Sequence, residues 1–399
     1  MTVQERVDGA TDSPTPPGIR LPSLTAMRTV AATLVFIHHA MFQPLFSDQG
    51  VQNAYNEFSR NLGPLSVMFF FVLSGFILTW SGKPRDGLKN YYRRRFFKIF
   101  PNHLVVYAIL LVLMFVAGRT ILWPEALANL PLMQAWVPSF DYQLLAVNPP
   151  TWTLSVELLF YLCFPLLLIV INRIRPGRLW LYAGLAAVAA LLMPVLSRLI
   201  LPDSPATPIS ASLSWPQLWF IYYFPVTRMF EFVVGMVMAR ILITGRWPNI
   251  RPSLIAAVVA AAYVATLPLK LFEEGYQIAF LIPLALAITG TAAADLAGRR
   301  TLFNTRVMVF LGEISYAFYL VHITVFFSLQ AAFNHQWGLG GMFTSRPFAT
   351  LPAIAFLIGS YLACLLVAWL LYSLVERPVM RRWGRPGRTR PTEAPAAVH

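Results

Sequence analysis

Apolar runs of roughly twenty residues recur along nearly the whole chain, and they constrain the fold more than any other feature of the sequence. Hydrophobic residues make up 57% of the 399 positions, whereas charged residues make up 12%. A run of about twenty apolar residues is long enough to cross the hydrocarbon core of a bilayer as an α-helix. The pattern therefore predicts an all-α, polytopic membrane protein, a bundle of about ten transmembrane helices. The expected spans cover residues 24–44, 65–82, 103–118, 153–172, 179–198, 217–239, 253–269, 276–294, 307–331 and 350–375.

The polar ends of the chain set the expected domain boundaries. Residues 1–22 are polar and proline-rich, and no apolar segment typical of a cleaved signal peptide precedes the first span. Residues 379–399 are short and basic. We expect a single transmembrane domain over residues 23–378, with a disordered cytoplasmic tail on either side.

The formal charge of +14 is explained by topology before it indicates any partner. With the N-terminus inside, most of the 31 lysines and arginines fall in cytoplasmic segments. Such an asymmetry is the positive-inside signature of membrane proteins. We therefore place both termini in the cytoplasm, predict a multi-pass protein of the cell membrane in contact with the lipid bilayer, and expect no nucleic-acid partner. The cations that fall outside are Arg60, Arg119, Arg198, Lys270 and Arg346.

The cysteines and histidines give no ground for a metal site. Cys163 and Cys364 both lie in apolar spans, where a thiol behaves as a small hydrophobic group. The histidines are scattered and lack the spacing of zinc ligands. We expect no disulfide, no metal and no permanently bound cofactor.

Two connections between the spans each have two interpretations. The outer connection 119–152 is rich in aromatic residues and proline, and it either caps a cavity or lies in the membrane interface as an aromatic belt. The cytoplasmic connection 83–102 carries seven cations. It is either a topology signal alone or a binding surface for a phosphate-rich ligand, because guanidinium groups clamp phosphates well.

Ionisable residues inside the membrane are costly, so they are functional candidates by default. Eleven residues of helix make about three full turns and a further 20°, so Arg28 and His39 share a face, whereas His38 lies about 80° away. The alternative for this pair is an arginine that reaches the headgroups and a histidine that is satisfied in the core. The intramembrane candidates are Arg28, His38, His39, Glu157, Arg228, Glu231, Glu313 and His322.

Depth along the helices brings three of these candidates to one level. A rise of about 1.5 Å per residue places His39, Glu157 and His322 about 22–24 Å from the cytoplasmic side. A histidine near a buried carboxylate suits general base catalysis, because the carboxylate orients the ring and stabilises the imidazolium. The group that pairs with His39 is not readable from the sequence. For Glu157, the alternative is a structural ion pair with an intramembrane arginine.

Six blocks of the chain, in this order, resemble the signature blocks of the membrane acyltransferase 3 family of O-acyltransferases. The resemblance covers residues 20–378, nearly the whole chain, and the ordered set is specific although each block alone is weak. The blocks are SLTAMRTVAATLVFIHH, SVMFFFVLSGFILTWS, YYRRRFFKIFP, PPTWTLSVELLFYLCFP, RMFEFVVG and GEISYAFYLVH.

The resemblance implies a role for several residues. The family's arginine and histidine of the first span correspond to Arg28 and His39, and the histidine is taken as catalytic. The serine of the family's Ser-Gly-Phe block corresponds to Ser74. The family's pair of arginines in the second cytoplasmic connection corresponds to Arg95 and Lys98, next to Arg94; here a lysine replaces the second arginine. Thr25 stands where many members carry aspartate, so the aspartate's role has no counterpart here.

The implied activity is transfer of an acyl group from cytoplasmic acyl-CoA to a hydroxyl group of a sugar or glycosylated metabolite. His39 would act as the general base, with Arg28 and Glu157 as further catalytic residues, while Arg94, Arg95, Lys98 and Ser74 would hold acyl-CoA. A compact chain favours a diffusible acceptor such as a macrolide over a cell-envelope polysaccharide. A transporter is an alternative from another class, as is a scaffold or sensor protein. The acyl chain, the acceptor, the oligomeric state and the choice between direct transfer and an acyl-histidine stay open.

Overall fold

The computed structural model describes residues 19–82, 87–248, 250–268, 279–299, 302–333 and 346–384. Most of the two predicted tails lies outside the described residues, as do part of the basic connection and Lys270.

Helices occupy all of the predicted spans, and the prediction of a mainly helical protein is confirmed. Within the described ranges, six helical stretches are long and apolar enough to cross a membrane, and Pro252–Thr266 and Leu281–Leu296 are shorter apolar helices. The count of about ten crossings therefore stays a prediction. The helices at the predicted spans are α1 (Pro22–Ala40), α3 (Leu62–Ser81), α4 (Leu88–Val116), α7 (Trp152–Asn172), α8 (Leu179–Ile200), α10 (Pro225–Ile243), α11 (Pro252–Thr266), α12 (Leu281–Leu296), α13 (Arg306–Phe333) and α14 (Thr350–Leu371).

Short elements connect these helices. The departures from an all-α fold among the described residues are an antiparallel hairpin of β1 (Ala206–Thr207) and β2 (Ser210–Ser214) and an isolated β-bridge between Phe46 and Phe348. The short helices are α2 (Gln49–Ser59), α5 (Trp123–Asn129), η1 (Gln134–Trp136), α6 (Phe140–Leu144), η2 (Pro149–Thr151), η3 (Pro176–Arg178), α9 (Trp215–Leu218), η4 (Trp219–Tyr223), η6 (Leu302–Asn304), η8 (Tyr372–Glu376) and α15 (Arg377–Arg382).

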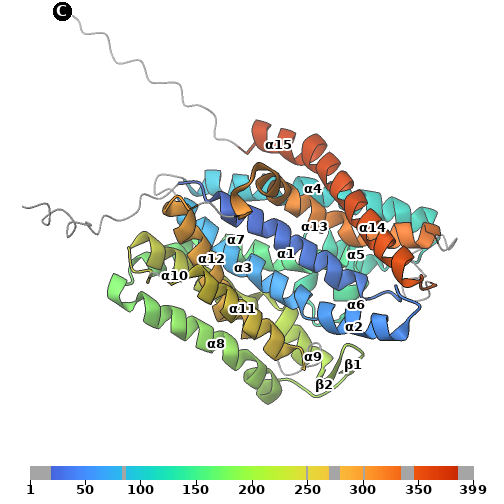
Figure 1. The fold of residues 1–399 in the computed structure, drawn as a ribbon, viewed down its shortest axis with the longest axis horizontal. Helices are drawn as coiled ribbons and strands as arrows, with labels where there is room; N and C mark the ends of the chain where they lie inside the picture. Colours follow the sequence, from blue (N-terminus) through green and yellow to red (C-terminus); the bar gives the residue numbers. More distant parts are fainter. Residues whose placement is uncertain are drawn as a thin grey trace, which may run out of the picture.

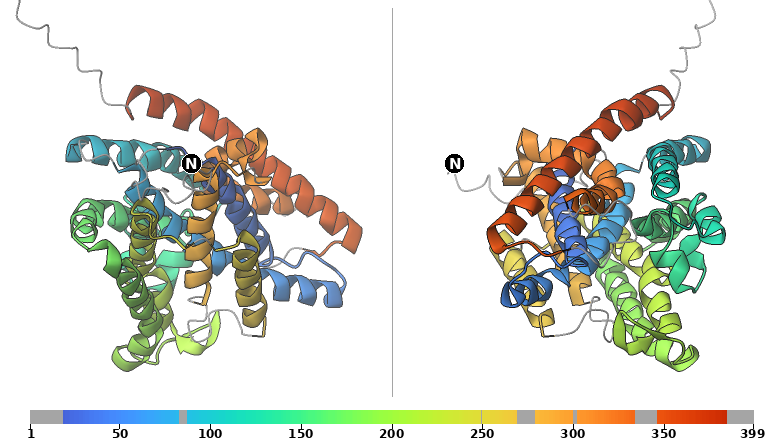
Figure 2. Two further views of the ribbon diagram at one scale, coloured as in Figure 1. Left: turned by 60° about the vertical axis from the view of Figure 1, so that its left-hand side comes forward. Right: turned by 90° about the vertical axis from the view of Figure 1, so that its right-hand side faces the viewer.

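The core is built around α1 and α3 in the middle of the bundle (Figure 1). Helix α1 packs between α3 and α13, α10 packs against the other side of α3, and α8 covers α10. Helix α14 runs along the outside of the bundle beside α13 (Figure 2). The two ends of α1 are therefore surrounded by other helices, which places its polar residues in the interior.

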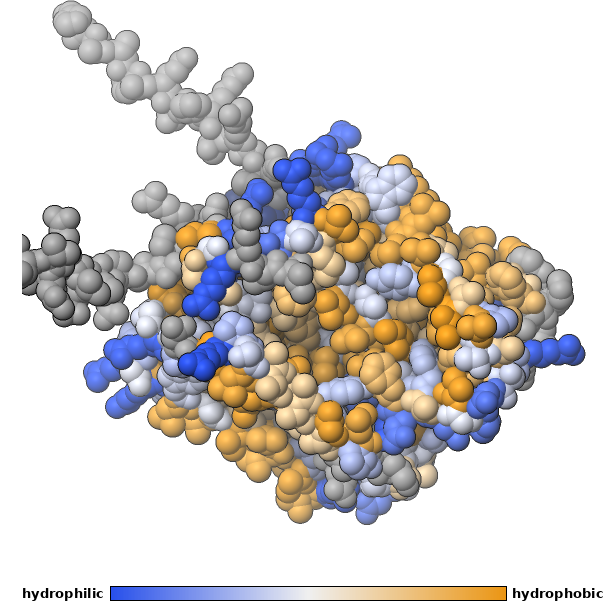
Figure 3. Space-filling view, in the orientation of Figure 1, coloured by the Kyte–Doolittle hydropathy of each residue, from blue (hydrophilic) through white to orange (hydrophobic). Residues whose placement is uncertain are grey.

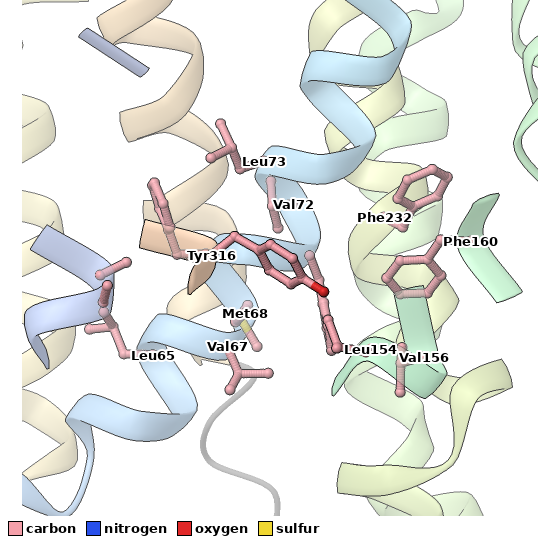
Figure 4. Packing of buried hydrophobic residues seen from close by; sticks show 14 of the residues in the cluster. Leu65, Val67, Met68, Val72, Leu73, Leu154, Val156, Phe160, Phe232 and Tyr316 are labelled. Carbon is pink, nitrogen blue, oxygen red and sulfur yellow. The ribbon is translucent and has the colours of Figure 1, made fainter. Parts of the chain in front are cut away.

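Helices α3 and α10 cross at backbone contact. A Cβ on Gly75 would lie 2.0 Å from the Phe232 carbonyl oxygen, and a Cβ on Gly235 would lie 2.0 Å from that of Val72. Only glycine fits such a crossing, because any side chain would force the helices apart. Next to it, the rings of Phe160 and Phe232 stack with centroids 4.7 Å apart (Figure 4). The glycine of the Ser-Gly-Phe block therefore has a packing role.

The prediction of a connection over residues 83–102 is wrong for residues 88–102, which form the first half of α4. The cations of this segment alternate with aromatic residues that anchor the helix. The hydroxyl groups of Tyr91 and Tyr92 donate to the carbonyl oxygens of Tyr161 and Leu162 on α7, at 3.2 and 3.0 Å. The charges of this segment alone suggested a loop. Its aromatic side chains, however, give the helix a face that packs against α7.

The outer connection packs against the helix bundle. The Asn148 side chain donates to the Leu320 carbonyl oxygen of α13 at 3.0 Å, and Asn129 donates to the Thr151 hydroxyl oxygen at 2.8 Å. The Tyr319 hydroxyl reaches the Pro150 carbonyl oxygen at 2.8 Å. The connection thus descends into the bundle before α7 begins.

The surface fits a protein embedded in lipid. Hydrophobic side chains predominate over the middle of one face, and hydrophilic ones lie mainly at its margins (Figure 3). Thr25 of α1 and Arg381 of α15 line the same pocket, so the two ends of the described chain lie on one side of the bundle. The assignment of this side of the bundle to the cytoplasm stays a prediction.

Candidate active site

His39 and His322 form a pair of histidines between α1 and α13. His39 Nδ1 lies 3.0 Å from His322 Nε2 and 3.0 Å from the Val35 carbonyl oxygen. His322 Nδ1 lies 2.7 Å from the Tyr319 carbonyl oxygen. His322 is 1% exposed, whereas His39 is half-buried. The partner of His39 that the sequence left open is therefore a second histidine.

His38 has different surroundings from its neighbour. Its Nδ1 lies 3.1 Å from the Ser59 carbonyl oxygen, and the side chain is buried. The ring packs on Gly63, where a Cβ would lie 2.3 Å from the ring carbon Cδ2. His38 thus ties α1 to the segment between α2 and α3, while its neighbour faces α13.

Arg28, Lys98 and Glu157 line a common internal space, which we call the inner cavity. It has a volume of about 90 Å³. Aromatic and hydroxyl side chains form much of the wall, and its polar end includes Thr153 and Tyr319. Its lining residues are Arg28, Val67, Phe70, Phe71, Lys98, Ile99, Thr153, Leu154, Glu157, Tyr161, Ser315, Tyr316 and Tyr319.

Tyr161 connects two further predicted residues to this cavity. Its hydroxyl donates to Glu157 Oε2 at 3.3 Å and is also hydrogen-bonded by Ser74. The Arg95 guanidinium carbon lies 5.5 Å from the centroid of the Tyr161 ring, within cation–π range. Ser74 and Arg95 thus contact Tyr161, which is itself part of the cavity wall.

A second, open pocket of about 600 Å³ lies next to the inner cavity, and we call it the cationic basin. It contains five cationic side chains and two carboxylates. Arg28 and Lys98 line both the basin and the inner cavity, so the two spaces adjoin at these side chains. The charged residues of the basin are Arg28, Arg94, Lys98, Glu313, Glu376, Arg377 and Arg381.

An ion pair stands at this boundary. Lys98 donates to Glu376 Oε1, and Asn102 donates to Glu376 Oε2 at 2.7 Å. Glu376 is 3% exposed. The sequence alone did not single out Glu376, Arg377 or Arg381 as functional residues. One sequence feature could have indicated the site, because the glutamate at position 376 directly follows a long apolar span.

The structure does not bring Glu157 to His39. The predicted depth counted Glu157 from the membrane surface, whereas the start of α7 is held within the bundle, where Thr153 donates to the Tyr319 hydroxyl oxygen at 2.9 Å. Glu157 lines the inner cavity together with Arg28, and Arg28, Arg95 and Lys98 are the cations that act on its carboxylate.

Arg228, the other intramembrane arginine, is paired elsewhere. Its Nη1 lies 2.9 Å from Glu231 Oε1, one turn away on α10, and both side chains are almost fully buried. The guanidinium also lies over the rings of Phe71 and Tyr222. These contacts make the Arg228–Glu231 pair part of the packing of the core. The intramembrane arginine that acts on Glu157 is therefore Arg28 and not Arg228.

Metal ligands are not clustered in the part of the chain that the structure describes. No group of three or more histidine, cysteine, aspartate or glutamate side chains there is placed to hold a metal ion. Cys163 and Cys364 are both free thiols.

Comparison with known proteins defines the class. The model of the acyltransferase 3 family, an acyltransferase domain, matches residues 21–373, and the chain therefore belongs to this family of integral membrane proteins. The family predicted from the signature blocks and the membrane location are both confirmed.

Among individual proteins, the chain is similar to the acyltransferase MdmB of Streptomyces mycarofaciens. The two are 38% identical over 387 residues, which cover 94% of this chain and 96% of the relative. Nodulation protein 10 of Rhizobium leguminosarum is 25% identical over 79% of this chain and 82% of its own length. The peptidoglycan O-acetyltransferase OatA of Listeria monocytogenes is 23% identical over 76% of this chain but only 49% of its own length. No solved structure matches the chain significantly.

Proposed function

We propose that the protein transfers an acyl group from acyl-CoA to a hydroxyl group of a sugar or a glycosylated small metabolite such as a macrolide, with His39 as the general base. This proposal rests on one observation: the cationic basin and the inner cavity share Arg28 and Lys98 in their walls. Together they line a path that begins among cations and reaches Tyr319, whose carbonyl oxygen accepts a hydrogen bond from His322 of the histidine pair.

The basin suits the phosphates of a nucleotide-bearing donor. Arg94, Arg377 and Arg381 come from two helices, and guanidinium groups bind phosphate through paired hydrogen bonds. Arg377 and Arg381 are exposed, so the charges are available to a ligand in solution. The acyl-CoA headgroup would therefore remain in the basin while its thioester arm extends inward.

The inner cavity is small. Its volume of about 90 Å³ lies below the roughly 300–1,000 Å³ of a typical ligand pocket, so a thioester arm would need a wider space. The Lys98–Glu376 ion pair stands between the two spaces. A bound phosphate competes with Glu376 for Lys98, and movement of this lysine would widen the passage toward the thioester's reaction site.

His39 suits the chemical step at the other end of the path. It is half-buried, and within the part of the chain that the structure describes its ring is hydrogen-bonded through Nδ1. A positioned histidine can take the proton of an attacking hydroxyl group and return it to the leaving group. Removal of such a base typically slows an enzyme by about a hundredfold to ten thousandfold.

The choice of acceptor rests on the comparisons. The chain is more similar to MdmB, and over nearly the full length of both proteins, than to OatA, which it matches over about half of OatA's length. This difference favours an acceptor other than the peptidoglycan named for OatA. Acylation of a cell-envelope polysaccharide by the same chemistry is the second candidate, and the peptidoglycan O-acetyltransferases among the relatives support it.

The test is label transfer by the purified, reconstituted protein. It is incubated with [14C]acetyl-CoA and, separately, a glycosylated macrolide, an oligosaccharide and soluble peptidoglycan fragments. We expect label in the macrolide by ester linkage, and none with the His39→Ala variant. Label in the peptidoglycan fragments alone would favour the envelope candidate. Movement of labelled compound across the membrane without any ester product would indicate a transporter and contradict the proposal.

A further inference from the structure

We infer that His322 is a positioning residue that holds the proton of His39 on Nδ1, so that His39 Nε2 is the nitrogen that receives the acceptor's proton. This inference rests on the proposed function. It assigns His322 a role in turnover that neither the family resemblance nor the sequence provided.

The hydrogen-bond partners fix the tautomer of His322. A backbone carbonyl oxygen only accepts hydrogen bonds, so the nitrogen 2.7 Å from the Tyr319 carbonyl oxygen carries a hydrogen. That nitrogen is Nδ1. In a neutral imidazole the other nitrogen is then an acceptor. His322 thus presents an unprotonated Nε2 to His39.

The same logic fixes His39. Its Nδ1 lies 3.0 Å from two acceptors, the Val35 carbonyl oxygen and His322 Nε2, and it therefore donates. The Val35 carbonyl also accepts the backbone N–H of residue 39 in α1, as in any α-helix, so it is shared. His322 Nε2 is the acceptor that is dedicated to this proton. His39 Nε2 is left with its lone pair free.

The surroundings hold His322 in one orientation. Its ring lies nearly parallel to that of Phe318, with an interplanar angle of 6° and centroids 6.0 Å apart. The Cys364 thiol donates to its backbone carbonyl oxygen at 3.6 Å, and the side chain is 1% exposed. A ring that is clamped in this way can orient a neighbour without moving itself.

The proton balance follows from this arrangement. His39 Nε2 takes the proton of the acceptor hydroxyl as its oxygen attacks the thioester carbonyl carbon. The resulting His39 imidazolium donates from Nδ1 to His322 Nε2, which stabilises its positive charge. When the tetrahedral intermediate collapses, the carbon–sulfur bond breaks and the thiolate of CoA receives the proton from Nε2. The ester and free CoA are formed, and both histidines return to their starting state.

Two substitutions of His322 separate this role from packing. His322→Leu keeps an apolar side chain but offers no acceptor, and we expect kcat to fall by about ten- to a hundredfold, the effect of losing a hydrogen bond to a charged group. The KM values for acetyl-CoA and for the macrolide acceptor should stay within about twofold. His322→Gln places an amide oxygen near the position of Nε2, and it should restore most of the lost kcat. The matched control is His103→Leu, because His103 is also a buried histidine bound to carbonyl oxygens but lies on α4.

The outcomes are decisive even if one variant folds poorly. A kcat of His322→Leu within about twofold of the wild type, or a His322→Gln variant as slow as His322→Leu, would overturn the inference. Nitrogen-15 NMR of the wild-type protein, with His39 assigned by comparison with His39→Ala, should show Nδ1 protonated and Nε2 unprotonated; the opposite tautomer would also overturn it. If His39→Ala itself retains full acyl transfer, the proposed base is wrong, whatever His322 does.

Discussion

The two ends of α1 differ in how their polar residues are held. At the first end, Arg28 lines both the basin and the inner cavity, among cations that come from α4 and α15. At the other end, each histidine of the pair has a hydrogen-bond acceptor within 3.0 Å of its Nδ1 atom. One end offers charge to a ligand, and the other offers a ring in a fixed orientation.

This difference suggests a division of labour along one helix. A ligand with several phosphates needs many cations and tolerates some freedom in their placement, because charge attraction falls off gradually with distance. Proton transfer needs a base within about 3 Å of the proton that it removes, and therefore needs rigid support. Substitutions at the two ends should change different kinetic constants, and the following variants test this expectation.

The largest effect is expected at the rigid end. His39→Ala should lower kcat by about a hundredfold to ten thousandfold while the protein still inserts, because no other group takes the proton. His38→Ala should retain activity but lower thermal stability by about 1–3 kcal/mol, because the Ser59 carbonyl loses its partner. The measurement is label transfer combined with a melting curve in detergent. Loss of activity in His38→Ala with retention in His39→Ala would reverse the assignment.

A smaller effect is expected where Glu157 borders the passage. Glu157→Gln keeps the shape and the hydrogen bond with Tyr161, but it removes the negative charge among Arg28, Arg95 and Lys98. We expect kcat/KM for acyl-CoA to fall about tenfold, since unbalanced cations at this point cost about 1–2 kcal/mol. Steady-state kinetics with varied acyl-CoA gives this value. A loss as large as that of His39→Ala would mean that the carboxylate acts in the chemical step, and wild-type constants would leave it only a hydrogen-bonding role.

The sequence predicted what one helix determines by itself. The span of α1 and the candidates Arg28, His39 and Glu157 followed from apolar length and the cost of charge in lipid. The placement of Glu157 did not follow, because it depends on how far the outer connection descends into the bundle. That descent is set by tertiary contacts such as the one between Asn148 and Leu320, which no local pattern encodes.

The basic segment 83–102 also shows how far a local sequence pattern can predict a site. Its cations predicted a phosphate site, yet two of the five cations of the basin, Arg377 and Arg381, come from α15, far away in the sequence. Lys98 was predicted as a phosphate ligand, and the structure pairs it with Glu376. A pattern within one segment names the chemistry that a site needs, whereas partners from distant segments become visible only in the fold.

Arg95→Lys sharpens the comparison at the charged end. The substitution keeps the positive charge near Tyr161 but removes the planar fork that binds phosphate through paired hydrogen bonds. We expect the KM for acyl-CoA to rise about fivefold, equivalent to one hydrogen bond of about 1 kcal/mol, with kcat unchanged. Accessibility labelling of the inserted protein checks that the topology is kept. An unchanged KM would return the segment to a purely topological role.

The smallest effect is expected at the rim of the basin, in α15. Arg381 lines the basin and is exposed, and an exposed charge contributes only about 0.2–1 kcal/mol to binding. Arg381→Gln should therefore raise the KM for acyl-CoA about two- to threefold at low ionic strength.

The neighbouring Arg382 provides the matched control for this substitution. It is also exposed, but its guanidinium lies over the Trp383 ring and it is not among the basin residues. Arg382→Gln should leave the KM unchanged. Salt should erase the difference between the two variants, because the Debye length falls to about 3 Å at 1 M. If both variants raise the KM equally, acyl-CoA senses only the overall charge of α15; if the Arg381 effect persists at high salt, Arg381 binds phosphate by direct contact instead of by long-range attraction.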